Sequence, residues 1–276
     1  MIETMCCFKI FKTSFFKKKL FYIGAPCSGK DYELKEKIGT GSFSRVYKAV
    51  YKPTGKYVAI KITNKDRRNL DDIRREAVVL QRMGRHEHIV KFYAYFEDEK
   101  NSYMILEYVN GCDLHEYIIS LDEPINEEIC IKWIIQIASA VAHAQSCGVT
   151  SRDIKPSNIL ITNEGVVKLA DFGLAFICND INTCKINTSA GSQSFSAPEV
   201  FDAEKNPYLA GPADVWSLGI VFYCMLTGYH PFDSKRYCEH FIDAKGLSIK
   251  TQEFLKSIFQ LDPLSRPKLE AFYSLI

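Results

Sequence analysis

The stretch that decides the fold is Ser151–Gly173, SRDIKPSNILITNEGVVKLADFG. Within it, two apolar runs stand on either side of a turn signal. The runs are residues 159–161 (ILI) and 166–169 (VVKL), and Asn163–Gly165 separates them. Apolar and β-branched residues on both sides of an Asn- and Gly-containing turn are typical of a short antiparallel hairpin. The sequence therefore predicts two short strands joined by a turn.

Polar side chains flank this predicted hairpin. Asp153 and Asn158 precede the first strand, and Asp171 follows the second. We expect the hairpin to present the first two at one end and Asp171 at the other. If the fold brings them together, two carboxylates and an amide supply the oxygen ligands that Mg²⁺ takes beside phosphate oxygens. A carboxylate that binds no metal could accept a proton from a hydroxyl group, which is the role of the base in phosphoryl transfer.

Residues 152–158 carry the pattern R-D-x-K-x-x-N, and D-F-G follows. With these motifs the stretch resembles the catalytic loop and metal-binding motif of eukaryotic protein kinases. The resemblance implies ATP and Mg²⁺ as cofactors and hydroxyl groups of protein substrates as acceptors. It makes Asp153 the catalytic base and Lys155 the side chain that stabilises charge on the transferred group. Asn158 and Asp171 are then the Mg²⁺ ligands.

A glycine-rich segment, Ile38–Val46 (IGTGSFSRV), lies upstream. The residues after it, 45–51 (RVYKAVY), are β-branched and aromatic, so they predict a returning strand instead of the helix that opens after a dinucleotide-binding motif. This hairpin resembles the kinase Gly-rich loop, with Ser44 in place of the third glycine. The resemblance implies nucleotide contacts from Ile38, Gly39, Thr40, Gly41, Ser42, Phe43, Ser44 and Val46.

The next predicted strand, Tyr57–Ile62, resembles the kinase V-A-I-K motif. The resemblance places Ala59 at the nucleotide and Lys61 at the α- and β-phosphates. Residues 71–83 predict an amphipathic helix. Beside its apolar stripe stands Glu76, which we expect to form an ion pair with Lys61.

Leu106–Val109 resembles the hinge between the two kinase lobes. It implies that backbone groups of Glu107 and Val109 hold the adenine, with Leu106 as the gatekeeper behind it, and Leu160 is a further expected nucleotide contact. Composition changes here from strand-like to helix-like. We therefore expect an extension at residues 1–30 and a kinase domain at 31–276, divided into 31–109 and 110–276.

The expected fold class is α+β, in the two-lobed kinase arrangement. It has an antiparallel β lobe with one helix, then a larger and mainly helical lobe. In the second lobe, Asn126 is a suitable N-cap for a helix that reaches residue 146, and Trp216–Leu226 predicts a buried core helix. The resemblance further implies that Asp214 holds the catalytic-loop backbone and that Arg266 pairs with Glu199.

The segment from the D-F-G motif to A-P-E resembles a kinase activation loop. The resemblance suggests that an upstream kinase phosphorylates Thr188 and that the phosphate pairs with Arg152. Lys155 and Ser192 resemble the serine/threonine branch. Ser151, however, stands where the family usually has histidine. This departure leaves a pseudokinase scaffold, which binds nucleotide with little turnover, as the alternative.

The totals describe an ordinary globular protein, with 47% apolar and 25% charged residues. The net charge of +2 favours neither nucleic acid nor an acidic partner. Ten cysteines form no C-x-x-C pair, so reduced and mostly buried thiols are expected. No apolar run reaches the length of a membrane span. We therefore expect an intracellular protein, in the cytoplasm or the nucleus.

Two features near the N-terminus have alternative interpretations. Residues 1–23 are basic and aromatic, so they could bind an anionic membrane surface with Cys6 and Cys7 acylated. A disordered or loosely docked extension is the favoured interpretation. Residues 24–30 (GAPCSGK) match a P-loop pattern, but Asp31 follows where Ser or Thr is needed. A P-loop hydrolase that uses Lys30 is therefore a poor alternative.

Overall fold

The computed structural model describes residues 22–24, 29–232 and 246–276. The described chain divides into two compact units. One contains residues up to Gln81 together with Lys91–Tyr108, and the other contains Arg82–Val90 and Val109–Ile276. Residues 1–21 of the basic N-terminal segment and residues 25–28 of the P-loop-like motif lie outside the described residues. The motif ends in the 3₁₀ turn η1 (Gly29–Asp31), after which a strand and not a P-loop helix begins.

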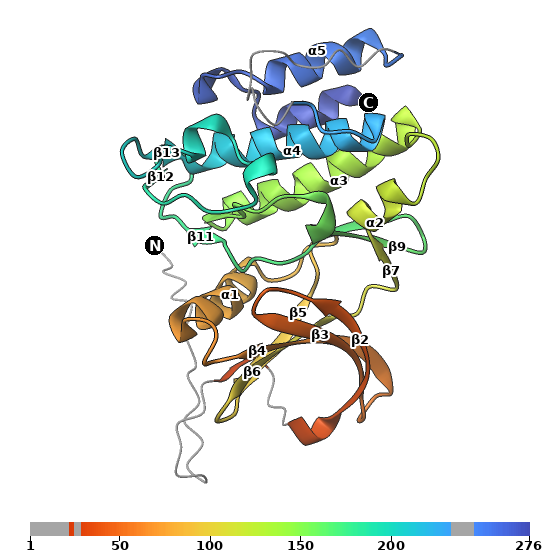
Figure 1. Ribbon diagram of the computed structural model, residues 1–276, viewed down its shortest axis with the longest axis vertical. Helices are drawn as coiled ribbons and strands as arrows, with labels where there is room; N and C mark the ends of the chain where they lie inside the picture. Colours follow the sequence, from red (N-terminus) through yellow and green to blue (C-terminus); the bar gives the residue numbers. More distant parts are fainter. Residues whose placement is uncertain (1–21, 25–28, 233–245) are drawn as a thin grey trace, which may run out of the picture. The chain divides into compact units, whose positions relative to one another are not determined.

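The N-terminal unit is built on one antiparallel sheet with the strand order β1-β5-β6-β4-β3-β2 (Figure 1). Helix α1 follows the third strand of the central meander. The bounds are β1 Tyr22–Gly24, β2 Tyr32–Thr40, β3 Ser44–Tyr51, β4 Lys56–Asn64, α1 Leu70–Met83, β5 Phe92–Glu97 and β6 Asn101–Glu107. This arrangement confirms the predicted β lobe with one helix.

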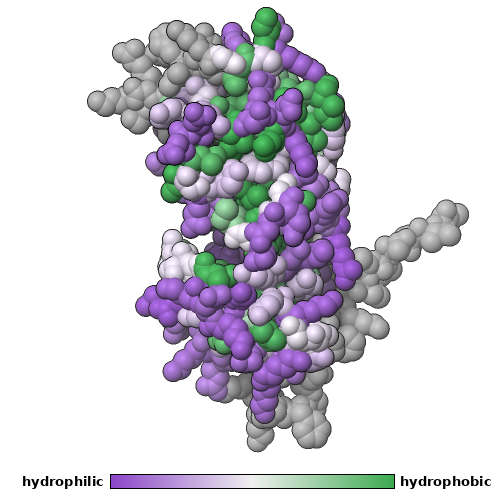
Figure 2. All heavy atoms as spheres, turned by 90° about the vertical axis from the view of Figure 1, so that its right-hand side faces the viewer, coloured by the Kyte–Doolittle hydropathy of each residue, from purple (hydrophilic) through white to green (hydrophobic). Residues whose placement is uncertain are grey.

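Side chains alternate between the two faces of each strand, which explains how this sheet buries one of its faces. One face buries a cluster of small and β-branched side chains: Ala49, Val58, Ile60, Ala94 and Ile105. The edge strand β2 has a sequence rich in Lys and Glu, and nearly all of its residues are exposed. The face of the unit that carries β2 is accordingly mostly hydrophilic (Figure 2). Charged side chains on an edge strand also disfavour pairing with other chains.

The C-terminal unit is mainly helical, as predicted. Its helices are α2 Leu114–Ile119, α3 Glu127–Ser146, α4 Ala210–Thr227 and α5 Ile249–Ile258. Short strands lie between these helices: β7 Gly111–Asp113, β8 Val149–Thr150, β9 Ile159–Thr162, β10 Val167–Leu169, β11 Phe176–Ile177, β12 Lys185–Ile186 and β13 Tyr208–Leu209. The 3₁₀ turns are η2 Pro156–Asn158, η3 Gln193–Phe195, η4 Pro198–Val200, η5 Pro263–Ser265 and η6 Leu269–Leu275.

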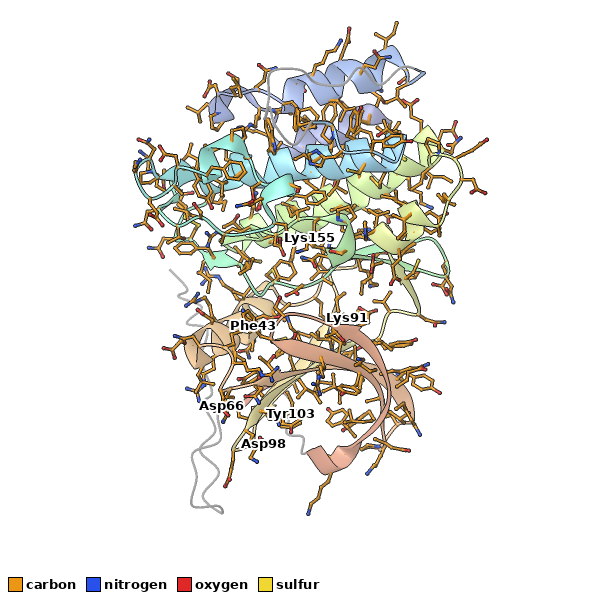
Figure 3. All side chains as sticks on the ribbon, in the orientation of Figure 1. Phe43, Asp66, Lys91, Asp98, Tyr103 and Lys155 are labelled. Carbon is orange, nitrogen blue, oxygen red and sulfur yellow. A yellow bond between two sulfur atoms is a disulfide. The ribbon has the colours of Figure 1, made fainter. Side chains whose placement is uncertain are left out.

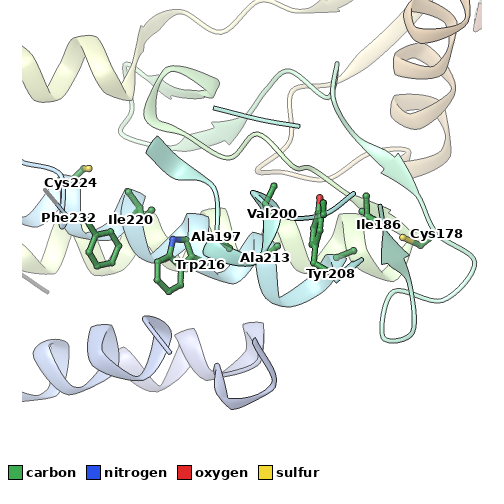
Figure 4. Close-up of a cluster of buried hydrophobic side chains, with 12 residues drawn as sticks. Cys178, Ile186, Ala197, Val200, Tyr208, Ala213, Trp216, Ile220, Cys224 and Phe232 are labelled. Carbon is green, nitrogen blue, oxygen red and sulfur yellow. The ribbon is translucent and has the colours of Figure 1, made fainter. Parts of the chain in front are cut away.

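Helix α4 forms the centre of this unit. It is long and apolar enough to cross a membrane, but 89% of it is buried, which makes it the predicted core helix. Trp216 is fully buried and stacks on Phe232 (Figure 4). A Cβ on Gly219 would lie 2.4 Å from Ile258, so only glycine permits this close approach of α4 to α5.

Helix α3 and the β9–β10 hairpin position the catalytic loop. Asn126 caps α3 by accepting a hydrogen bond from the Glu128 N–H, as its sequence predicted. Trp133 of α3 donates its indole N–H to the carbonyl of Gly165 in the hairpin turn, at 2.9 Å. The hairpin pairs Val167 with Ile161. The predicted strands are therefore present and are attached to α3.

Three histidines pack against one another where the loop after α1 meets α3. The ring of His86 stacks on that of His143 with centroids 4.8 Å apart, and His88 lies 5.8 Å from His86. His143 Nε2 lies 2.8 Å from the Met83 carbonyl oxygen, and His86 Nε2 lies 3.3 Å from Ser139 Oγ. This histidine cluster therefore connects Met83 and the loop after it to α3, within the C-terminal unit.

The cluster predicts that stability depends on pH. Burial lowers the pKa of His86 below 6.5, and interactions with His143, His88 and, least of all, Lys168 lower it further, while the carboxylate of Glu87 opposes the shift. The folded state therefore favours the neutral form of His86. Its contribution to stability is fully present above about pH 6.5 and is lost as the pH falls toward the lowered pKa.

We expect His86→Gln to reduce the loss of unfolding free energy between about pH 7.5 and about pH 5.5, because glutamine cannot be protonated in this range. The measurement is urea unfolding followed by tryptophan fluorescence. The exposed His115, changed to Gln, is the control and should keep the wild-type pH dependence. An unchanged pH dependence in His86→Gln would contradict the prediction.

Candidate active site

The backbone of the catalytic loop is held by a buried carboxylate. Asp214 of α4 accepts hydrogen bonds from Thr150 Oγ1 (2.7 Å) and from the N–H groups of Ser151 (3.2 Å) and Arg152 (3.1 Å). Burial raises the pKa of Asp214, and these hydrogen bonds oppose that shift. They also stabilise Arg152 in a left-handed conformation with φ 64°. The contact expected of Asp214 is therefore present.

Asp153 lies at the centre of a hydrogen-bonded group of four side chains. Lys155 Nζ lies 2.8 Å from its Oδ2, and the Asn158 amide nitrogen donates to the same oxygen at 3.0 Å. Ser192 donates its N–H and its hydroxyl to Oδ1, at 3.0 and 2.9 Å. Lys155 Nζ also donates to Ser192 Oγ at 2.7 Å. The structure thus assembles the three predicted catalytic residues around one carboxylate.

The two expected Mg²⁺ ligands are linked through the backbone. The Ala170 N–H, directly before Asp171, donates to the Asn158 carbonyl at 2.8 Å. Asp171 has φ 55° and accepts a hydrogen bond from the Gly173 N–H at 3.0 Å. The Asn158 amide nitrogen faces Asp153, which leaves its oxygen for a cation. A carboxylate and an amide oxygen suit Mg²⁺, so the residues present fit this metal.

Ser151 is 1% exposed, and its hydroxyl forms no hydrogen bond with any residue that the structure describes. Phe172 of the D-F-G motif is equally buried. The serine therefore fills a core position where a polar group has no partner. Its backbone still makes the bond to Asp214, so the change from histidine leaves the catalytic loop attached.

The activation segment is attached to the catalytic loop through Arg152. Its guanidinium group donates to the Thr188 hydroxyl at 3.1 Å and to the Tyr208 hydroxyl at 3.2 Å. Strand β11 pairs with β8, and β12 pairs with β13. A Cβ on Gly191 would lie 2.3 Å from the Arg152 carbonyl oxygen, and φ there is +106°. Only glycine therefore lets the segment pass this close to the catalytic loop.

The expectation that the cysteines are reduced is wrong for one pair. Cys178 and Cys184 form a disulfide within the activation segment. The other cysteines among the described residues are free: Cys112, Cys130, Cys147 and Cys224. No C-x-x-C spacing marked the pair, because the bond depends on a loop that brings two residues six positions apart into contact.

The end of the activation segment carries a buried ion pair. Arg266 binds Glu199 through two parallel hydrogen bonds of 2.6 and 2.8 Å. This confirms the predicted pair. The Arg266 guanidinium carbon also lies 4.8 Å from the centre of the Trp216 ring. The pair therefore joins the A-P-E motif to the core of the C-terminal unit.

In the N-terminal unit, Lys61 of β4 and Glu76 of α1 form the predicted ion pair at 2.6 Å, with both side chains largely buried. Sequence reasoning missed Arg68, which binds the second carboxylate oxygen of Glu76 at 3.1 Å. A basic residue just before the helix start was its only signal. Because Glu76 is held on both oxygens, the Lys61 side chain has a well-defined position.

The Gly-rich segment is a hairpin, as predicted. Strand β2 pairs with β3 in the register Gly39 to Val46, and the Gly41 N–H donates to the Ser44 carbonyl at 2.9 Å. Phe43 stands at its tip (Figure 3), and its side chain is 52% exposed. The remaining expected nucleotide contacts are Ile38 and Thr40 at the end of β2 and Ser42 in the turn that follows. Ser44 thus closes the turn in the absence of a third glycine.

The expected adenine-binding residues occupy neighbouring strands within each unit. Ala59 of β4 pairs with Leu106 of β6, and the Glu107 N–H donates to the Lys91 carbonyl at 2.8 Å. Val109 and Leu160 belong to the C-terminal unit. There, Leu160 of β9 pairs with Asp113 of β7. The candidate residues therefore form two sets, one on each unit.

Comparison with known proteins agrees with this geometry. The sequence model of the family described as "Protein kinase domain" matches residues 32–274. The chain is 36% identical over 247 residues to maternal embryonic leucine zipper kinase of Xenopus laevis, covering 86% of this chain and 37% of the relative. It is 33% identical over 248 residues to CBL-interacting protein kinase 17 of Oryza sativa subsp. japonica, covering 85% and 54%.

A third relative is serine/threonine-protein kinase RAD53 of Saccharomyces cerevisiae. It is 32% identical over 265 residues, which cover 86% of this chain and 32% of the relative. The chain thus spans between about a third and about half of the length of these three relatives.

Proposed function

The chain belongs to the protein kinase family, and from this we propose that it transfers the γ-phosphate of ATP to serine and threonine hydroxyls of protein substrates. The observation that carries the proposal is the group of side chains around Asp153. Its two oxygens are held by Lys155, Asn158 and Ser192. A carboxylate held in this way can accept the proton of a substrate hydroxyl as that oxygen attacks phosphorus.

Each residue has a separate role in the proposed reaction. Asp153 orients the substrate hydroxyl and takes its proton. Lys155, bonded to both Asp153 and Ser192, stabilises negative charge on the transferred group. Lys61, positioned by Glu76, binds the α- and β-phosphates. Mg²⁺, when bound by Asn158 and Asp171, would neutralise charge on the phosphate oxygens.

The choice of serine and threonine rests on Lys155 and Ser192. Their side chains bond to each other and to the base, which is the pairing that resembles the serine/threonine branch. The relative RAD53 is named a serine/threonine-protein kinase. The pseudokinase alternative loses support, because Lys61, Glu76, Asp153 and the metal ligands are all present. The intracellular location and the extent of the kinase domain stay predictions.

The test is phosphoryl transfer from ATP and Mg²⁺ to a generic protein substrate, followed by phosphoamino acid analysis. We expect phosphoserine and phosphothreonine. Nucleotide binding without transfer, or phosphotyrosine alone, would overturn the proposal.

Phosphorylation of Thr188 is expected to raise activity by about tenfold or more, since hydrogen bonds between a guanidinium and a phosphate are about twice as strong as neutral ones. Arg152 already contacts the Thr188 hydroxyl. The measurement is the transfer rate before and after phosphorylation by an upstream kinase, in the wild type and in Thr188→Ala. The exposed Thr183, changed to Ala, is the matched control and should keep the activation. Full activity in Thr188→Ala would contradict the prediction.

A further inference from the structure

The disulfide joins two strands that are each attached to the rest of the C-terminal unit. Cys178 directly follows β11, and its N–H donates to the Gly148 carbonyl at 2.7 Å. Cys184 directly precedes β12, and its carbonyl accepts a hydrogen bond from the Ala210 N–H at 3.2 Å. The five residues between them form a loop in which Asp180 accepts hydrogen bonds from its neighbours.

Both strands lead directly to residues of the candidate active site. Strand β11 pairs with β8, after which the chain enters the catalytic loop at Ser151. Strand β12 ends two residues before Thr188, which Arg152 contacts. The disulfide therefore fixes the separation between the end of β11 and the start of β12, within the activation segment. Without the covalent bond, this loop would be held closed by two pairs of two-residue strands and by the few hydrogen bonds of Cys178, Cys184 and Asp180.

The packing around the two sulfur atoms is unequal. Cys178 is 2% exposed and belongs to a buried cluster with Ile186 and Tyr208 (Figure 4). Cys184 is only partly buried at the edge of this cluster. Cys224, a free cysteine of the same cluster, has its pKa raised to about 12 by burial. Because the thiolate is the attacking form, Cys224 does not compete for the disulfide at neutral pH.

We propose that Cys178 and Cys184 form a thiol–disulfide exchange site for low-molecular-weight thiols and disulfides, and that the oxidised pair holds the activation segment in its active arrangement. The regulatory part rests on the proposed kinase function. Disulfides in reducing compartments are usually transient and redox-sensing, which fits a bond placed in a segment that controls activity.

Two external thiols supply the two electrons that reduce the Cys178–Cys184 disulfide. A thiolate attacks Sγ of the more accessible Cys184, the Cys178–Cys184 bond breaks, and Cys178 leaves as a thiolate that takes up a proton. A second external thiolate then attacks the mixed disulfide at the external sulfur, and Cys184 is released as a thiol. The net products are two protein thiols and one external disulfide, and the reverse sequence reforms the bond.

The redox state can be read from one peptide. Trypsin cleavage after Lys168 and Lys185 releases residues 169–185, which contain both cysteines and no other Lys or Arg until Lys185. The full chain is equilibrated in buffers of reduced and oxidised glutathione, alkylated and digested. We expect the peptide to pass from an unalkylated form, lighter by two hydrogens, to a doubly alkylated form as the buffer becomes reducing.

Kinase activity is measured at the same redox states. We expect transfer by the oxidised wild type to be about fivefold faster than by the reduced wild type, because loop closure no longer has to be achieved by weak contacts alone. Cys184→Ser and the double variant Cys178→Ala, Cys184→Ala should stay at the reduced level in both buffers. Cys147→Ser, a free and half-buried cysteine, is the control and should respond like the wild type.

Three results would overturn the proposal. The first is that the peptide is never found as a disulfide. The second is that oxidised and reduced wild type transfer phosphate at equal rates although the peptide shows complete conversion. The third is that Cys184→Ser responds to the buffers as the wild type does. If neither redox state transfers phosphate, the proposed function itself fails. The exchange site is then judged by limited trypsin cleavage after Lys185 in the native protein. Faster cleavage of the reduced form supports the site, and equal rates overturn it.

Discussion

Changing Asp153 to asparagine is expected to lower kcat by about a thousandfold, within the range of 10²–10⁴ that general-base catalysis contributes. An amide cannot accept the proton of the substrate hydroxyl. The NH₂ group of the asparagine would also face either Lys155 or Ser192. Both of these residues donate to the carboxylate of Asp153, so one of them would lose its acceptor. Nucleotide affinity should change little, because Asp153 is not among the residues proposed to hold the phosphates or Mg²⁺.

The measurement is steady-state transfer to a protein substrate, together with equilibrium binding of ATP in the presence of Mg²⁺. Asp202→Asn is the matched control, because Asp202 is an exposed carboxylate of the same unit and should keep wild-type turnover. If Asp153→Asn kept more than about a tenth of the activity, Asp153 would not be the base.

Changing Arg266 to methionine is expected to lower the unfolding free energy of the C-terminal unit by about 3–5 kcal/mol, the usual cost of removing one partner from a buried pair. The Arg266 side chain is fully buried. Besides Glu199, its guanidinium group binds the carbonyls of Gln260 (2.9 Å) and Pro212 (3.1 Å). The substitution therefore leaves a carboxylate and two carbonyl groups without their donor.

Tryptophan fluorescence during urea unfolding reports this unit alone, because both tryptophans of the chain, Trp133 and Trp216, lie in it. Arg85→Met is the control for losing an exposed arginine and should change stability by less than about 0.5 kcal/mol. The double variant Arg266→Met, Glu199→Gln should recover part of the loss, because no uncompensated charge remains. A loss below about 1 kcal/mol in Arg266→Met would refute the argument.

The helices and the catalytic motifs could be predicted because their signals are local. The N-cap Asn126 predicts the start of α3, and the apolar run of α4 predicts a buried helix. Both signals lie within the helix or next to it in the sequence. Asp153, Lys155 and Asn158 fall within six positions, so a hairpin and one 3₁₀ turn suffice to bring them together. The resemblance to protein kinases then supplied the distant partners of Lys61 and Arg266, which spacing alone would not have identified.

Other contacts had no such signal. Arg68 joins the Lys61–Glu76 pair, and His86 stacks on a histidine more than fifty residues away. The expectation of reduced cysteines was wrong for Cys178 and Cys184, because scattered cysteines show their pairing only when the backbone is folded. Each of these contacts depends on the exact separation of two elements, which short sequence patterns do not encode.

By itself, the sequence predicted the two-lobed kinase fold, placed Asp153, Lys155 and Asn158 in one loop, and supplied the ion pairs that the family motifs imply. Only the tertiary structure decided that Ser192 and Lys155 hold both oxygens of Asp153, that Arg152 contacts the unmodified Thr188 and also Tyr208, and that a disulfide closes a loop within the activation segment. The physical reason is that hydrogen bonds and disulfides form only within a few ångströms. Residues 36 to 56 positions apart reach that range only after the core around α4 has packed.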